Sequence, residues 1–556
     1  MRRTLARVLV AWAIGTAAGC AIVRRTFALD VDERHPSAII ASVWVRGQLA
    51  ARAVLAGAGD PSPLLAAALA AHPGSTLVHE TVVAEGPVLW GRFEVALALS
   101  VVAGHDGLSA TCRGRTEYLT PDELLAHQAY DKGIAIPSLG LTTGLDVPLA
   151  LALLSERCGV TVRELSDGAL RRFRVVRSTP GALPSRPVNA ETMTDDDVRA
   201  SAVAAGAFLA RGVDGEGRFR YLVDAPTNRT LPGYDWPRHA GATYFLAQVA
   251  ALSGDADIGS AALRAAARLR DLATVACGEH RCIGSNSVVD LGSTALAVIA
   301  FAEVARTKLD PRYAHLVPPL TAFLRSQQRP DGEFMHLYDR GSDRPIDVQL
   351  LYYSGEASLA LSRAHILLGD ARDLEAASRA LSHLVGAAWS FLGSRYYFGE
   401  EHWTCQAMDD LWDRSPNRFA LDFCLRWQAF NRQLQYATGD TAYDADGAYG
   451  FGPILTPRLT PVGSRSEAGI ATLDAAQRSG ISPAELGQLE GQTRRALALL
   501  IRQQFRPGPQ HLFADPAAIL GGMPGSEVDW QLRIDYAQHS GSALIRWLTR
   551  AHGAAD

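Results

Sequence analysis

Apolar positions from about residue 190 to the end of the chain fall into long helical runs that short polar segments separate. Six of these runs begin with small residues and continue into stretches rich in alanine and leucine. They start near Gly241, Gly292, Gly355, Cys405, Ala468 and Ser540. The starts lie about 50 to 70 residues apart, which is the length that a hairpin of two helices with its loops requires. Because the runs are apolar on all sides, they predict six buried inner helices, and six such hairpins predict a closed (α/α)6 toroid.

Internal repeats support this organisation. The segment Asp214–Phe219 follows Phe208-Leu209, and Asp331–Phe334 follows Phe323-Leu324 in the same way. A degenerate third copy begins at Leu500. The C-terminal part of the chain is therefore predicted to be a mainly helical toroid that spans residues 193–556.

Residues 27–177 have a mixed pattern that predicts a smaller α+β domain of unknown role. We expect a helix in the apolar stretch near residues 37–57, a strand in the alternating run at 93–103, and a hairpin turn at His105–Gly107. Thr120 followed by Pro121, Asp122 and Glu123 predicts a helix start, because threonine caps helices and acidic residues favour the first turn. The segment 178–192 is rich in Pro, Gly and Ser, and is interpreted as a linker.

Residues 1–26 indicate targeting rather than fold. Early arginines precede an apolar run of about 16 residues, shorter than the roughly 20 that a membrane span needs. Ala17–Cys20 is similar to a lipoprotein cleavage site, although Ala17 stands where leucine is usual, and the arginines after the run favour an uncleaved signal anchor. We expect an exported protein of the cell envelope that is tethered to the membrane by this segment, with lipidation of Cys20 left open.

Charge and cysteine content narrow the classes of function. The net charge of -4 argues against a dedicated nucleic-acid binder. Lys132 and Lys308 are the only lysines, which disfavours lysine-dependent chemistry. Cys277 and Cys282 are close enough in sequence to form a small disulfide loop, whereas a zinc site there lacks a fourth ligand. No cofactor and no metal are expected.

The six predicted hairpins and the Asp-Gly-x-Phe loops resemble the six-hairpin glycosidase-like superfamily over roughly residues 195–556. The resemblance implies a site at one end of the ring, but it leaves the reaction open, because such toroids include glycoside hydrolases, uronyl hydrolases, sugar epimerases, lyases and cyclases. The amino-terminal ends of the inner helices are unusually polar, so we expect them to form this site. Their acidic residues predict the catalytic carboxylates of glycoside hydrolysis, and the candidates are Glu356, Glu467, Asp535 and Glu401.

Other polar and aromatic residues at the same ends predict substrate binding. These are Arg238, His239, Tyr352, Tyr353, His402, Trp403, Asp409, Arg465, Arg533 and His539. The arginines favour an anionic sugar such as a uronate, unless each pairs locally with an acid such as Asp535 or Glu467. The histidines favour proton transfer, as in the epimerases of this superfamily. The acids themselves are alternatively explained as helix caps.

The sequence thus predicts an exported enzyme that hydrolyses a glycan by carboxylate acid/base catalysis. Two alternatives stay open. One is a sugar epimerase that uses His and Glu, and the other is an inactive toroid that binds a polysaccharide or a partner protein.

Overall fold

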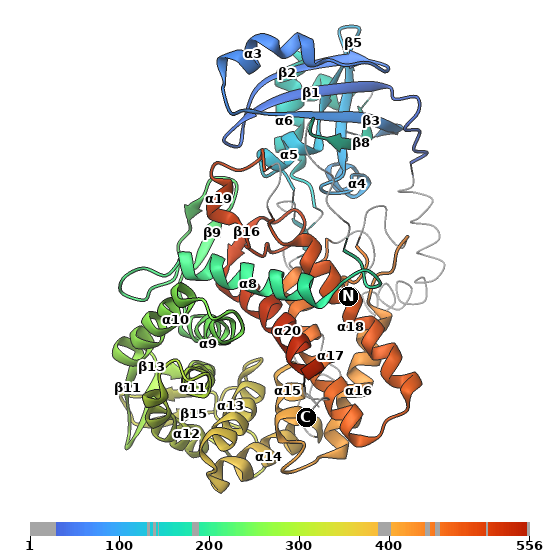
Figure 1. Ribbon diagram of the computed structural model, residues 1–556. Coiled ribbons are helices and arrows are strands. Elements are labelled where there is room, and N and C mark those ends of the chain that lie inside the picture. The colour runs from blue at the N-terminus through green and yellow to red at the C-terminus, as the bar shows by residue number, and fades with distance from the viewer. Residues whose placement is uncertain are drawn as a thin grey trace.

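The computed structural model describes residues 29–552, except 90, 131–133, 137–140, 143, 169, 181–187, 387–401, 440–444, 451–455 and 507–509. The targeting segment predicted for residues 1–26 lies outside this part of the chain. Within it, no helix is both long and apolar enough to cross a membrane. The protein is mainly helical, and a separate sheet region lies above a ring of helices (Figure 1).

The sheet region contains a six-stranded antiparallel sheet in the order β2-β1-β3-β8-β4-β5. Its strands are β1 (Ala38–Val45), β2 (Gln48–Ala56), β3 (Thr76–Leu89), β4 (Asp106–Cys112), β5 (Arg115–Leu119) and β8 (Leu170–Ser178). Short β6 (Ile134–Ile136) and β7 (Leu141–Thr142) pair with each other. The helices of this region are η1 (Ser62–Leu65), α3 (Ala66–Ala71), α4 (Glu94–Ser100), α5 (Pro121–Ala126), α6 (Val147–Cys158) and α7 (Val162–Ser166).

The helix expected near residues 37–57 is wrong. This stretch forms the β1–β2 hairpin, which turns at Arg46 and Gly47, both with positive φ. Two consecutive positive φ values match the twist of a two-residue hairpin turn. β-Branched and aromatic residues in β1 favour the strand, and overall apolarity alone could not separate the two structures.

The secondary structure expected around residues 93–107 is also wrong. Glu94–Ser100 forms α4 rather than a strand, since its alanines and leucines are good helix formers. Asp106 begins β4, and the β4–β5 hairpin instead turns at Arg113 and Gly114. The helix start at Thr120 is confirmed, because Thr120 and Glu123 form a reciprocal capping box.

Twelve helices of the described chain alternate between an inner and an outer layer. The inner helices are α9 (Trp236–Ser253), α11 (Leu291–Arg306), α13 (Tyr353–Leu368), α15 (His402–Leu411), α17 (Leu459–Ser479) and α20 (Ile534–His552). The outer helices are α8 (Asp195–Arg211), α10 (Ala256–Arg268), α12 (Val317–Ser326), α14 (Ala371–Gly386), α16 (Arg418–Gln433) and α18 (Pro483–Gln503). Each of the six predicted runs lies in one inner helix, so the hairpin count is confirmed.

Contacts between neighbouring inner helices close the ring. Each inner helix packs against the next, and α20 returns to pack against α9. At that closure a β-carbon on Gly541 would lie 2.1 Å from the ring of Phe245. The small residues that mark the inner helices therefore permit this close approach.

The predicted repeats correspond to loops that dock on the next outer helix. Gln328 donates hydrogen bonds from its amide to the Gly332 and Ala376 carbonyl oxygens. Gln504, in the predicted degenerate copy, donates in the same way to Gly521 and Ser201. Another copy at Gln435 bonds to Gly447 and Gln492 and was missed, because its sequence departs further from the pattern.

Short strands precede several inner helices at their amino-terminal ends. One three-stranded sheet contains β9 (Leu222–Asp224), β10 (Arg229–Thr230) and β16 (Gln531–Arg533). A second contains β13 (Val288–Asp290), β14 (Leu337–Asp339) and β15 (Arg344–Ile346). A hairpin contains β11 (Thr274–Cys277) and β12 (His280–Ile283). Three short helical segments, η3 (Leu269–Ala273), η4 (Pro311–Leu316) and α19 (Pro516–Ile519), complete the toroid.

The sheet region packs on the toroid beside β9, β16 and α19 (Figure 1). Phe513 and Val528 of the toroid share one apolar cluster with Trp44 and Tyr130 of the sheet region. Polar pairs cross the same boundary, such as His511 Nε2 with Asp122 Oδ2 at 2.7 Å. The two regions are therefore joined by a buried interface and not only by the segment between them.

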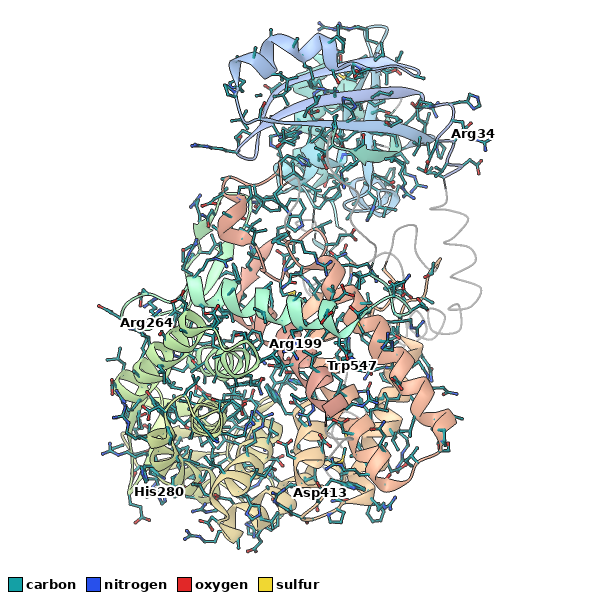
Figure 2. All side chains as sticks on the ribbon, in the orientation of Figure 1. Arg34, Arg199, Arg264, His280, Asp413 and Trp547 are labelled. Atoms are coloured by element: carbon teal, nitrogen blue, oxygen red, sulfur yellow. A yellow bond between two sulfur atoms is a disulfide. The ribbon has the colours of Figure 1, made fainter. Side chains whose placement is uncertain are left out.

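Three disulfides link the six cysteines that follow Cys20. They join Cys112 to Cys158, Cys277 to Cys282, and Cys405 to Cys424. The expected Cys277–Cys282 loop is confirmed, and neighbouring His280 lies at the outer edge of the toroid (Figure 2). Because both cysteines of this loop are bonded to each other, they are not available to a zinc ion.

Candidate active site

Three predicted site residues meet near the centre of the ring, and we call His402, Glu467 and His539 the histidine cluster. They come from the neighbouring inner helices α15, α17 and α20. Donor atoms of the three side chains all lie within 4.8 Å of one another. Glu467 is fully buried, whereas the His539 side chain keeps 13% of its surface exposed. His539 is thus the member of the cluster that a ligand can reach.

Glu467 orients the His539 ring. Nδ1 of His539 lies 2.8 Å from Oε2 of Glu467. With the carboxylate ionised, Nδ1 donates this bond, and Nε2 is left as a proton acceptor. Burial raises the pKa of Glu467, and the adjacent His539 opposes that rise. The pair therefore has the arrangement of a carboxylate-supported general base.

Tyr244 of α9 supports Glu467 from the other side. Its hydroxyl lies 3.5 Å from Oε1 of Glu467 and accepts a hydrogen bond from the Gln538 amide at 2.7 Å. Burial, together with the charge of Glu467, raises the pKa of Tyr244. Neither Tyr244 nor Gln538 was identified from the sequence. Tyr244 lies within an apolar helical run, and Gln538 lies between Asp535 and His539, whose side chains were the candidates of that segment.

Aromatic side chains flank the two imidazoles. The Trp403 ring lies 4.5 Å from the His402 ring and 5.6 Å from the His539 ring, between centroids. Tyr352 lies 6.2 Å from His402 and has a φ of +76° at the start of α13. A bulky residue in this left-handed region is strained, and such strain concentrates at functional sites.

Glu356 and Tyr353 lie together at the start of α13. Both pack over Gly292 of α11, where a β-carbon would lie 2.4 Å from Glu356 Oε2. Glu356 is buried. Burial, with Asp290 and Glu356 nearby, raises the pKa of Tyr353. A second carboxylate thus lies at the amino-terminal end of the ring, next to an aromatic hydroxyl.

Asp535 is held in an ion-pair network. It accepts hydrogen bonds from Arg533 Nε at 2.6 Å and from Arg238 Nε at 3.0 Å. Burial alone would raise the pKa of Asp535, but Arg533 and Arg238 hold it below its ordinary value. Asp535 is therefore ionised at neutral pH, which does not suit a general acid. The sequence left open whether Arg533 binds an anionic sugar or pairs with Asp535, and the structure contains the local pair.

Two of the predicted binding residues point toward the outer layer. His239 Nε2 bonds to the Ala265 carbonyl at 2.9 Å, and its Nδ1 lies 2.6 Å from the Tyr234 hydroxyl. Burial lowers the pKa of His239 to about 4. The Arg465 guanidinium lies 5.0 Å from the Tyr449 ring centroid, in the loop after α16. Both were expected at the mouth of the ring, and a helix turn of 100° per residue explains why neighbours in sequence face different layers.

Asp409 and Glu401 complete the predicted set. Asp409 follows His402 by two helical turns, about 10 Å along the axis, and lies at the carboxyl-terminal end of the ring. There it pairs with Arg478 and Arg546. It was therefore expected at the wrong end. Glu401 lies outside the described residues.

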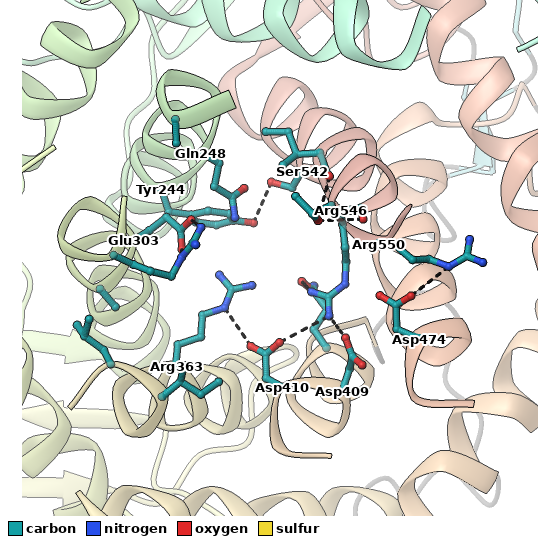
Figure 3. A pocket seen from close by; sticks show the side chains of 18 of the residues that line it. Tyr244, Gln248, Glu303, Arg363, Asp409, Asp410, Asp474, Ser542, Arg546 and Arg550 are labelled. Carbon is teal, nitrogen blue, oxygen red and sulfur yellow. Dashed lines mark hydrogen bonds and ion pairs between the residues drawn. The ribbon is translucent and has the colours of Figure 1, made fainter. Parts of the chain in front are cut away.

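The inner helices surround a cavity of about 1150 Å³ at their carboxyl-terminal ends, which we call the C-terminal cavity (Figure 3). Its lining includes Tyr244, Gln248, Arg363, Gln406, Asp410 and Arg546. This cavity was not predicted from the sequence, because the polar segments that predicted a site lie at the amino-terminal ends of the inner helices. The recurrence of arginine near the ends of α11, α13, α17 and α20 was the available signal.

The histidine cluster also has the donor set of a metal site. Two imidazoles and one carboxylate within 4.8 Å of one another suit a divalent transition metal with open coordination positions. No metal was expected, because the three residues come from separate hairpins and their sequence spacing gives no indication of a site. His402, Glu467 and His539 are thus the described residues that could hold a metal.

Comparisons with known proteins identify the fold. No protein-family model matches the chain, and no curated protein matches it in sequence. Among solved structures, a D-mannose isomerase is 11% identical with a TM-score of 0.50, and the match covers 66% of this chain and 100% of that one. A sugar epimerase from a ruminal bacterium is 12% identical, with a TM-score of 0.49 and 64% and 99% covered. An unsaturated glucuronyl hydrolase specific for heparin is 13% identical, with a TM-score of 0.47 and 65% and 99% covered. At such identities the likeness shows the six-hairpin toroid fold alone, which confirms the expected architecture.

Proposed function

We propose that this protein is a carbohydrate-active enzyme that moves a proton at a carbon of a sugar, as an isomerase or epimerase does. The observation that carries the proposal is the histidine cluster, in which Glu467 orients His539 beside a second imidazole. One solved protein with this fold is a D-mannose isomerase, so the toroid can house this kind of reaction.

His539 is the proposed base. In an open-chain sugar, its Nε2 takes the proton from the carbon next to the carbonyl group, and the resulting enediolate is reprotonated. Protonation of the former carbonyl carbon, with transfer of a proton from the oxygen of the deprotonated carbon to the former carbonyl oxygen, gives an isomer. Protonation of the original carbon on its opposite face gives an epimer. Because the donor atoms of His402 and His539 lie within 4.8 Å, a sugar ring does not fit between them. We therefore expect both imidazoles to lie on one face of the substrate, with His539 in contact with it. An epimer then forms only if the enediolate turns its other face toward them.

The charges around the site favour a neutral sugar. Arg533 and Arg238, which were expected to bind an anion, are engaged by Asp535. Binding a uronate through them would require one of these pairs to break. The aromatic rings of Trp403 and Tyr352 offer apolar surfaces of the kind that pack against sugar faces.

Glycan hydrolysis is the second candidate. Glu356 and Glu467 are both buried carboxylates, and burial raises the pKa of Glu467, as a general acid requires. Asp535 is held ionised by two arginines, so it is excluded as the general acid of this reaction and would serve only as its base. Hydrolysis would release new reducing ends, whereas proton transfer would not.

We further propose that the protein works in an oxidising compartment outside the cytoplasm. Three disulfides and the targeting pattern of residues 1–26 support export. The test is to add a thiol-specific label to the protein in its native host and to measure whether the six cysteines of these bonds react before any reduction. Labelling of these cysteines without prior reduction would contradict it.

A product screen tests the reaction. The full chain is incubated with glucose, mannose, cellobiose and mannobiose, and products are identified by NMR and by reducing-end assay. We expect a new isomer or epimer without new reducing ends, and a loss of at least about 100-fold in His539→Asn. His315→Asn, which makes the same change at an exposed histidine of the toroid, is the matched control. New reducing ends would favour hydrolysis. If a chelator removes the activity and zinc restores it, the histidine cluster acts as a metal site and not as a free base.

A further inference from the structure

The C-terminal cavity is a second concave site, distinct from the histidine cluster. Its volume of about 1150 Å³ is large enough for a small-molecule ligand. Arg363, Arg546 and Gln248 project toward its open centre (Figure 3). Tyr244 lies in its wall, and the hydroxyl of this residue also approaches Glu467. The two sites are therefore separated by one layer of side chains.

Acidic and basic side chains balance in the cavity lining. Five arginines and five carboxylates line it. They form pairs, which include Arg363 with Asp410 at 3.2 Å, Arg478 with Asp413 at 2.8 Å and Arg550 with Asp474 at 3.1 Å. A charged ligand would have to break one of these pairs and leave a poorly solvated charge behind. The lining therefore disfavours both anions and cations.

Polar atoms in the wall still lack partners. Arg363 Nη1, Gln406 Nε2 and Gln248 Oε1 are shielded from solvent and have no hydrogen-bond partner within the described chain. Gln406 as a residue is only 2% exposed. The first two atoms donate hydrogen bonds and the third accepts one. A glutamine side chain has one accepting oxygen and one donating nitrogen, whichever of the two positions each atom occupies. A hydroxyl group can satisfy both kinds, because it donates and accepts at once.

We propose that the C-terminal cavity binds a neutral, hydroxyl-rich ligand, namely a saccharide, separately from the histidine cluster. The paired charges hold planar guanidinium and carboxylate groups in place, and these bond to hydroxyls without a change in net charge. Arg363 Nη1, Gln406 Nε2 and Gln248 Oε1 turn toward the ligand when it binds and supply the remaining donors and acceptor. This site does not depend on which reaction the histidine cluster performs.

Calorimetric titration of the full chain tests the proposal, with cellobiose and mannobiose as neutral probes and glucuronate as the anionic one. Measurements at pH 8 keep Asp409 ionised, since burial raises its pKa to about 7 against the effect of Arg546. We expect a neutral disaccharide to bind, and Gln248→Leu to weaken this binding about tenfold, the effect of one lost buried hydrogen bond. Gln406→Leu serves as a second variant if the first unfolds.

Two controls separate this site from the proposed active site. Gln433→Leu makes the same chemical change on the exposed end of α16 and is expected to leave binding unchanged. His539→Asn is expected to abolish turnover and to leave the cavity occupied. Binding that is lost in His539→Asn but kept in Gln248→Leu would place the sugar elsewhere and overturn the proposal. Binding of glucuronate alone, or of none of the probes, would overturn it as well.

Discussion

At the scale of single residues, the surroundings of each side chain decide what it does. His239 and His539 both lie near the starts of inner helices, yet His239 is buried against α10 and His539 reaches the centre of the ring. The sequence could nominate both histidines but could not separate them, because it does not show which layer each one faces.

His239 predicts a pH dependence of stability. Its pKa is about 4 in the folded protein, because burial disfavours the charged ring, against an ordinary value of 6.5. The folded state therefore loses stability as the pH falls from about 6.5 toward 4, by up to about 3 kcal/mol. Urea unfolding at several pH values should show a flatter acid limb in His239→Gln than in the wild type. Equal slopes in the two proteins would contradict the assignment.

Glu467 predicts a loss of activity without a loss of fold. Glu467→Gln keeps the shape of the side chain but removes the charge that orients and stabilises the His539 ring, so turnover should fall about 100- to 1000-fold. Glu375→Gln, on the exposed face of α14, makes the same change and should have no effect. A variant that stays within about threefold of wild-type turnover would exclude Glu467 from the mechanism.

At the scale of elements, the start of α13 combines strain with exposure. Tyr352 has a φ of +76° and is 40% exposed, while Tyr353 and Glu356 follow it into the buried ring. The left-handed conformation aims an aromatic ring at the site, and it costs about 1 kcal/mol for a residue other than glycine.

Replacement of Tyr352 should therefore separate stability from binding. Tyr352→Gly relieves the strain and should raise the free energy of unfolding by about 1 kcal/mol, while the loss of the aromatic face should raise KM several-fold. Tyr352→Asn removes the same aromatic face and should weaken binding equally. Thermal melts together with steady-state kinetics measure both effects, and a lower melting temperature in Tyr352→Gly would contradict the prediction.

At the scale of the whole molecule, the toroid could be predicted from the sequence and much of the site could not. Buried helices that are apolar on all sides leave a clear pattern, as Ala468 and Gly292 illustrate in α17 and α11. The predictions for the segments that form the β1–β2 hairpin and α4 were wrong, because short apolar runs fit either a helix or a strand. Asp409 was expected at the wrong end of the ring, because the helix bounds were not known.

The join between sheet region and toroid predicts cooperative unfolding. Phe513 is 5% exposed and packs 5.0 Å from Trp530, between ring centroids, in the cluster that both regions share. Phe513→Ala should cost about 3 kcal/mol and split one thermal transition into two. Phe419→Ala, at a position that is 83% exposed, should change stability by less than about 0.5 kcal/mol. A single unshifted transition in Phe513→Ala would show that this contact does not couple the two regions.

The central claim is that the histidine cluster moves a proton between solvent and a sugar carbon. Its most direct test is incubation of the full chain with glucose, mannose, cellobiose and mannobiose in deuterium oxide, followed by NMR at carbons 1 and 2. The account predicts deuterium at one of these carbons with the wild type, and at least about a 100-fold slower incorporation with His539→Asn. Turnover of any of these sugars without deuterium at carbon 1 or 2, or incorporation that His539→Asn leaves unchanged, would contradict it.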